Sequence, residues 1–274
     1  MIQFLRPVLA ATALTLVTAG AVLAGATVDR LAKVLLLDDV AAILQQEGLR
    51  HGDALDGDFL DGRGGDYFRR RVEDIYDIDA MMEAMRDELA QNMDDAAIAE
   101  TLEFFDSERG QRILRLEVSA RLAMADPEVE EAAADAYVAA SEDGDELAQA
   151  VDRFVEINDL LDRNLSGALG SNYRFYRGLV DGGGVKMSEG EILNQVWGQE
   201  ESLRESTGTW LDSFLYLAYG PLDQDEMQAY LDYSESAAGQ ALNTALFEGF
   251  EAVYDRIYYD LGRAVAEAMQ TSEL

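Results

Sequence analysis

Cysteine is absent from this 274-residue sequence, and histidine occurs once, at His51. The lack of cysteine excludes disulfide bonds, thiolate catalysis, cysteine-based zinc sites and a lipoprotein attachment site. A chain without thiols also suits an oxidising compartment, where no cysteine could pair wrongly. A Ser-His-Asp enzyme would have to use His51, but no Gly-x-Ser-x-Gly motif accompanies it. We therefore identify no catalytic residue from the sequence.

Basic residues are scarce. The chain has 21 Lys and Arg against 54 Asp and Glu, which gives a formal net charge of -33. Nucleic acids and anionic lipid head groups need clustered basic side chains, so neither is expected as a partner. The acidity favours solubility and permits a cation or a basic partner. With so many acids, chance pairs are common, and no pair can be singled out for acid–base chemistry.

Charged residues are almost missing from the first 26 positions, where Arg6 is the only one. An apolar run follows Pro7 and ends in the small residues Ala24-Gly25-Ala26. This layout is typical of a secretory signal peptide, which predicts removal of residues 1–26 and a periplasmic location. The alternative is an uncleaved anchor, because the run is long enough to cross a bilayer.

Only three prolines occur, and good helix formers such as Ala, Leu, Glu and Gln abound. We therefore expect an all-α fold. The predicted helices cover 28–47, 95–105, 108–125, 146–165, Ser188 to Tyr219, and 237–269. Three more are predicted to begin at Asp66, after an N-cap at Asp79, and after Asp126-Pro127. Gly48 is expected to end the first helix, and 167–184, which includes SNYRFYRG, to be rich in loops.

Aspartates cluster in a glycine-containing stretch before the second helix. They are Asp53, Asp56, Asp58, Asp61 and Asp66. Calcium prefers several carboxylate oxygens on a flexible loop, so this stretch is a candidate calcium site. The spacing does not fit an EF-hand, however, and a solvated turn explains it as well. We therefore commit to no metal ligand and no cofactor.

One pattern is present twice, in LEFFDSERGQRIL and YLDYSESAAGQALN, 129 positions apart. Its matched residues are Phe104, Ser107, Gly110 and Gln111 in the first copy, and Tyr233, Ser236, Gly239 and Gln240 in the second. Each copy predicts a helix, a kink and a new helix capped by the serine. The glycine would let a neighbouring backbone approach closely. We interpret the pattern as an internal duplication.

The first copy, with its upstream residues, resembles the bacterial family called domain of unknown function 2059. The resemblance covers Asp79 to Leu122 and, more weakly, Thr207 to Glu251. Both copies lack the proline that often follows the serine in that family, and the second replaces basic residues with Ala and Thr. The resemblance implies a helical, exported bacterial protein and supplies no catalytic residues.

Together these observations predict two related helical units, 27–143 and 144–274, packed into one bundle behind a signal peptide. The leading functional hypothesis is a non-enzymatic exported protein that binds an envelope protein or peptide between its units. No contact with nucleic acid, or with membrane after cleavage, is expected. The alternatives are a calcium binder using residues 53–66 and an unrecognised hydrolase. The hydrolase would need a cavity that holds either a carboxylate of raised pKa or His51 beside Ser and Asp.

Overall fold

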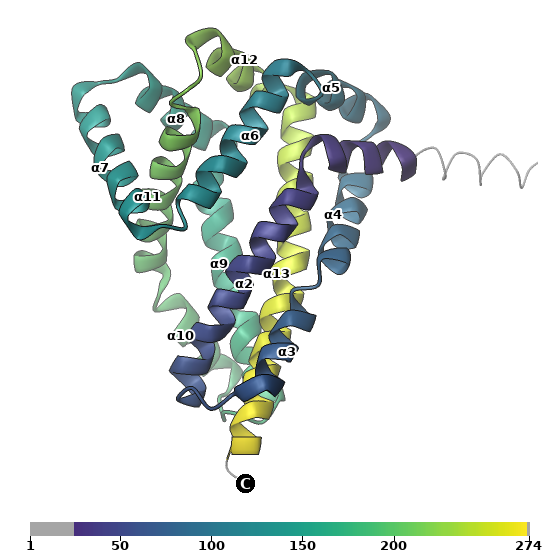
Figure 1. The fold of residues 1–274 in the computed structure, drawn as a ribbon, viewed down its shortest axis with the longest axis vertical. Coiled ribbons are helices and arrows are strands. Elements are labelled where there is room, and N and C mark those ends of the chain that lie inside the picture. Colours follow the sequence, from purple (N-terminus) through teal and green to yellow (C-terminus); the bar gives the residue numbers. More distant parts are fainter. Residues whose placement is uncertain (1–24, 273–274) are drawn as a thin grey trace, which may run out of the picture.

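The protein is all-α in a computed structural model that describes residues 25–272, and this part of the chain has no strand. A helix over residues 25–34 comes first (Figure 1). The helices that follow are α2 (Leu37–Leu60), α3 (Gly65–Ile75), α4 (Ile78–Asn92), α5 (Asp95–Phe105), α6 (Glu108–Ala123), α7 (Pro127–Asp143), α8 (Glu146–Ile157), α9 (Leu160–Asp181), α10 (Glu189–Trp197), α11 (Glu200–Tyr219), α12 (Gln224–Glu235) and α13 (Ala237–Ser272).

Most helix starts follow from short polar caps in the sequence. Ser188 and Glu191 form the predicted reciprocal capping box of α10, and Asp126 caps α7 with Pro127 at its first position. The N-cap predicted at Asp79 is wrong by two residues. Asp77 takes that role, and its side chain accepts a hydrogen bond from the Ala80 amide at 2.7 Å.

Two predicted helices are each broken in a way that the sequence did not indicate. The chain turns at Leu36 (φ 55°) before α2, and at Asp159 (φ 51°) before α9. Leu36 gives no local signal for its left-handed conformation, whereas aspartate adopts that conformation more often than most residues other than glycine. Gly48 does not end a helix but lies buried inside α2, which continues to Leu60. The predicted helix 188–219 is also divided, between α10 and α11.

The region 167–184, predicted to be rich in loops, is helical in α9 as far as Asp181. Its glycines allow close packing rather than breaking the helix. A Cβ at Gly178 would lie 2.1 Å from the Tyr259 carbonyl oxygen of α13, and a Cβ at Gly262 of α13 would lie 2.1 Å from the Phe175 carbonyl oxygen. Tertiary packing therefore overrides the low helix propensity of glycine here.

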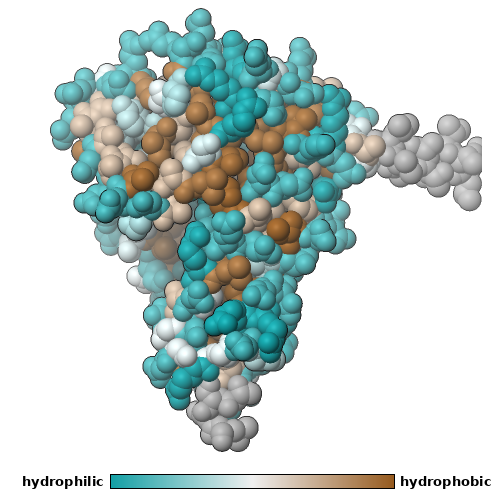
Figure 2. Space-filling view, in the orientation of Figure 1, coloured by the Kyte–Doolittle hydropathy of each residue, from teal (hydrophilic) through white to brown (hydrophobic). Residues whose placement is uncertain are grey.

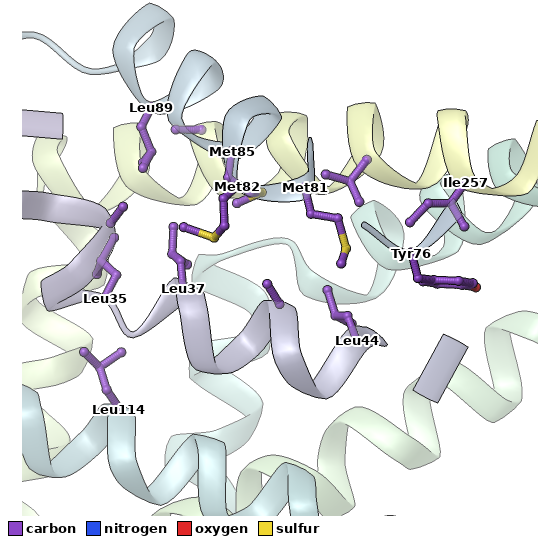
Figure 3. Packing of buried hydrophobic residues seen from close by; sticks show 14 of the residues in the cluster. Leu35, Leu37, Leu44, Tyr76, Met81, Met82, Met85, Leu89, Leu114 and Ile257 are labelled. Atoms are coloured by element: carbon purple, nitrogen blue, oxygen red, sulfur yellow. The ribbon is translucent and has the colours of Figure 1, made fainter. Parts of the chain in front are cut away.

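Helix α13 runs through the centre of the molecule, beside α9 and α4 (Figure 1). It therefore packs on a helix of the predicted first unit, and α6 of that unit packs in turn on α11 of the second. The core between α2, α4 and α13 includes the buried side chains of Leu44, Met81, Met82, Met85 and Ile257 (Figure 3). Because these contacts are exchanged, the two units share one core.

The predicted unit boundary at 143/144 falls in the turn between α7 and α8, where Gly144 has a positive φ of 70°. The predicted signal peptide lies outside the described residues, except for its last two positions, which begin the first helix. None of the helices in residues 25–272 has the length and apolar character needed to cross a membrane.

Candidate functional site

The first copy of the doubled motif forms an elbow between α5 and α6. Ser107 caps α6, and its hydroxyl accepts a hydrogen bond from the Gly110 amide at 3.1 Å. The Gln111 side-chain amide donates to the carbonyl oxygens of Phe105, at 2.9 Å, and Val34, at 2.8 Å. The elbow therefore also holds the end of the helix at residues 25–34.

The second copy forms the same set of contacts between α12 and α13. Ser236 accepts from the Gly239 amide at 3.0 Å. The Gln240 amide donates to the carbonyl oxygens of Ser234, at 2.7 Å, and Ile157, at 3.1 Å. Ile157 ends α8 just as Val34 ends the first helix. The two elbows thus have matching surroundings.

Both elbows need glycine for the same steric reason. A Cβ at Gly110 would lie 2.3 Å from the Phe104 carbonyl oxygen, and a Cβ at Gly239 would lie 2.1 Å from the Tyr233 carbonyl oxygen. The crowding atoms are backbone in each case, so they cannot rotate away. Any side chain at these positions would force the two helices apart.

The two elbows meet through matched aromatic residues. Phe104 and Tyr233 hold the same place in their copies, and their rings stack with centroids 4.5 Å apart. The Tyr233 hydroxyl also shares a hydrogen bond of 2.9 Å with Thr101. A residue in contact with its own counterpart lies on an approximate two-fold axis between the copies.

Further matched features lie upstream of the elbows, at a spacing of 123 positions. Leu36 and Asp159, the two non-glycine breaks described above, are one such pair. Arg30 forms an ion pair with Asp106 at 2.6 Å, and Arg153 forms one with Glu235 at 2.7 Å. The same ion pair thus fastens each leading helix to its elbow.

A cavity of about 1040 Å³ lies between the helices that these elbows position. Helices α2 and α9 line it with residues 123 positions apart, and α6 and α13 with residues 129 positions apart. The first set pairs Val40, Leu44, Glu47 and Gly48 with Arg163, Gly167, Gly170 and Ser171; the second pairs Glu117 and Arg121 with Leu246 and Phe250. Residues at matched positions of the two predicted units therefore line the walls. Hydrophobic side chains also gather on the molecular surface over α6 and α2 (Figure 2).

Glu117 is the most unusual polar group in the cavity wall. Its Oε1 accepts hydrogen bonds from the hydroxyls of Tyr219, at 2.8 Å, and Tyr230, at 3.0 Å. Burial raises the pKa of Glu117 above its ordinary value, and the two tyrosine hydrogen bonds oppose this shift. Burial also raises the pKa of both tyrosines, so they remain neutral donors.

Arg121, one helical turn after Glu117, is already paired. Its guanidinium donates two hydrogen bonds to the Glu47 carboxylate, at 2.7 and 3.1 Å, and lies over the Trp210 ring at 5.3 Å. This fork-like pairing leaves little capacity for an additional anion. Arg121 therefore closes part of the wall rather than offering a free charge.

His51 lies in the cavity wall beside Tyr258, with ring centroids 5.8 Å apart. Burial lowers its pKa, so the imidazole is neutral at pH 7, although the nearby Asp58 opposes the shift. No hydrogen bond joins His51 to a serine or carboxylate within residues 25–272. The arrangement that a Ser-His-Asp hydrolase needs is therefore not formed in this part of the chain.

The aspartates of the candidate calcium site do not form a ligand shell. Asp53, Asp56 and Asp58 lie on the continuous helix α2, and the Asp56 carboxylate accepts a hydrogen bond from the Gly64 amide at 2.7 Å. Asp61 and Asp66 pair with neighbouring arginines. Across residues 25–272, nowhere do three or more acidic or histidine side chains converge as a metal ion would require.

Sequence reasoning identified the elbows but missed Glu117. A signal was present, because Ile113 and Ala120 on the same helix are buried and Glu117 lies between them on that face. An acid within an apolar stripe marks a polar group turned toward the interior. The second copy has Leu246 at this position, so comparing the two copies would have revealed the difference.

A family model described as "Uncharacterized protein conserved in bacteria (DUF2059)" matches this chain at residues 79–137. The match begins where the resemblance of the first motif copy begins, and it supports that assignment. The family match does not extend to the second copy. No curated protein and no solved structure matches the chain.

Proposed function

We propose that this is a non-enzymatic binding protein that acts in the periplasm and takes a peptide segment of a partner into the cavity between two duplicated units. The single observation that carries the proposal is the cavity of about 1040 Å³ with walls from both units. Its volume reaches the upper end of the range typical of ligand pockets. Its mix of apolar walls and a few polar groups is also typical of binding sites.

The duplication is supported by the matched contacts of the two elbows. The capping serine, the glycine at the close approach and the bridging glutamine recur with the same partners. Two copies that meet at a two-fold axis present equivalent faces to each other, and here the cavity lies between such faces. We therefore regard the space between the copies as a product of the architecture and the place for a ligand.

Binding is favoured over hydrolysis by the chemistry of the wall. Glu117 has the raised pKa expected of a general acid, but its two hydrogen-bond partners are neutral tyrosines rather than a nucleophile and its base. Export is supported by the apolar N-terminal segment and by the absence of cysteine.

Filling the cavity tests the proposal. Gly167 and Gly170 line it, and a Cβ at either position would meet no atom within 4 Å. Gly167→Trp therefore adds a large side chain to open space without a backbone clash. A phage-displayed library of random peptides would be selected on the natural protein and each enriched peptide then measured against the variant. We expect peptides that bind the natural protein and lose at least tenfold in affinity for Gly167→Trp.

The matched control is Gly57→Trp, because Gly57 is also in a helix and has open space around it but does not line the cavity. Binding should survive in this variant. Both variants should keep the circular dichroism spectrum of the natural protein. No enriched peptide, or peptides that bind Gly167→Trp unchanged, would contradict a peptide-binding role for the cavity.

A further inference from the structure

We propose that the peptide segment presents a basic side chain, flanked by apolar residues, to the carboxylate of Glu117. This inference rests on the proposed function and specifies the chemistry of the partner. It follows from three features of the cavity. These are a carboxylate oxygen of Glu117 without a partner, an excess of negative charge, and apolar side chains around Glu117.

The first feature is the free half of the Glu117 carboxylate. Both tyrosine hydroxyls donate to the same oxygen, Oε1. The other oxygen, Oε2, has no hydrogen-bond or ion-pair partner among residues 25–272, and it is not one of the enclosed polar atoms without a partner. It therefore faces accessible space in the cavity wall, where a ligand donor could reach it.

The second feature is the balance of charge around the cavity. Five carboxylates line it, from Glu47, Glu117, Glu248, Glu251 and Asp255, against two guanidinium groups. Arg121 is paired with Glu47, Arg163 lies 3.9 Å from Asp159, and Asp255 is paired with Arg174 of α9. Glu117, Glu248 and Glu251 then form no salt bridge within the described part of the chain, so the uncompensated charge of the cavity lining is negative. A cationic group from the ligand would neutralise a carboxylate that burial has made costly to ionise.

The third feature is the set of apolar side chains around Glu117 and at the matched positions of α13. Tyr219, Tyr230 and Phe154 pack together beside Glu117, with ring centroids 4.9 to 5.8 Å apart. Leu246 and Phe250 line the cavity from α13, at the positions equivalent to Glu117 and Arg121. A lysine or arginine has a long apolar stem and a charged end, so it matches a carboxylate set among apolar side chains. An ammonium has three donors, which could reach Oε2 and the lone pairs of the tyrosine hydroxyls.

Three synthetic peptides test the inference by calorimetry. They are Ac-Leu-Phe-Lys-Phe-Leu-NH2 and its counterparts with norleucine or glutamate in place of lysine. We expect the lysine peptide to bind at least tenfold more tightly than the norleucine peptide, and the glutamate peptide to bind most weakly. Glu117→Gln keeps an acceptor for the tyrosines but removes the charge, so it should abolish the preference for lysine over norleucine.

Asp212→Asn is the matched control, since burial also raises the pKa of this carboxylate but it does not line the cavity, and the preference should remain. A norleucine peptide that binds as tightly as the lysine peptide and is blocked by Gly167→Trp would overturn this inference alone. A lysine preference that persists in Glu117→Gln would overturn it as well. If none of the three peptides binds and no library peptide is blocked by Gly167→Trp, the proposed function fails with it.

Discussion

Helices α6 and α13 begin with the same elbow and then differ in two ways. Helix α6 ends at Ala123, and the chain turns through Asp126-Pro127, whereas α13 continues through Asp255-Arg256 at the equivalent positions and ends at Ser272. A proline there disfavours a helical conformation of the residue before it, and an arginine does not. Asp255 instead pairs with Arg174 of α9, at 2.6 Å.

The second difference concerns the side chains that these helices direct into the cavity. Helix α6 contributes Glu117 and Arg121 where α13 contributes Leu246 and Phe250. The elbow contacts are the same in both helices, while the residues at these two matched positions are polar in α6 and apolar in α13. What the helices share therefore concerns folding, and what distinguishes them concerns the chemistry of the cavity.

The largest expected effect tests the shared part. Gly110→Ala and Gly239→Ala should each lower the free energy of unfolding by about 3 kcal/mol, because the new Cβ meets backbone atoms at 2.1 to 2.3 Å. Chemical denaturation would measure both. Gly57→Ala, with open space around its Cβ, should be neutral or slightly stabilising. A large effect at only one elbow would contradict their equivalence.

A smaller effect tests the polar wall. The pKa of Glu117 is raised by burial, so the folded protein binds this proton more tightly than the unfolded chain. Its contribution to stability is then greatest below the ordinary glutamate value of 4.5 and falls as the pH rises above it. Glu117→Gln should make the free energy of unfolding less dependent on pH in that direction.

Thermal denaturation from pH 4 upward would measure this difference. The matched control is Asp212→Asn, because Asp212 does not line the cavity. Burial, and to a smaller extent the charge of Asp152, raise the pKa of Asp212 to about 6. Asp212 therefore also makes the free energy of unfolding fall as the pH rises, and this contribution should remain in the Glu117→Gln variant. An identical pH profile for Glu117→Gln and the natural protein would contradict the raised pKa.

The smallest effect returns to the elbows. Ser107→Ala and Ser236→Ala each remove one capping hydrogen bond, of 3.1 and 3.0 Å, and should cost about 1 kcal/mol. Ser107→Ala also removes the bond that its hydroxyl donates to the Phe104 carbonyl oxygen at 2.5 Å, so its cost should be the larger of the two. Urea denaturation can resolve a change of this size. Costs that differ by more than about 1 kcal/mol between the two caps would weaken the comparison between α6 and α13.

Sequence reasoning succeeded where the determinants were local. Ser107, Ser188 and Asp126-Pro127 satisfy or replace backbone donors within a few residues, so the starts of α6, α10 and α7 were predictable. It failed where distant contacts decide. The left-handed residue Leu36 has no local signal.

The cavity could not be predicted for the same reason. Its walls come from helices far apart in the sequence, and α9, which supplies one of them, was expected to end in loops. The close approach of α9 and α13 at Gly178 and Gly262 is a contact between distant segments, which the local sequence does not reveal. Glu117 was one of 54 acids until the structure gave it two tyrosine partners.

The exchanged packing of α13 on α4 and of α6 on α11 has a consequence for how the chain can be divided. A break between α7 and α8 would separate α13 from α4 and α6 from α11, because each pair has one helix on either side of it. Each fragment would then expose apolar side chains that are buried in the whole chain. We therefore expect the two segments to unfold together as one cooperative unit rather than one after the other.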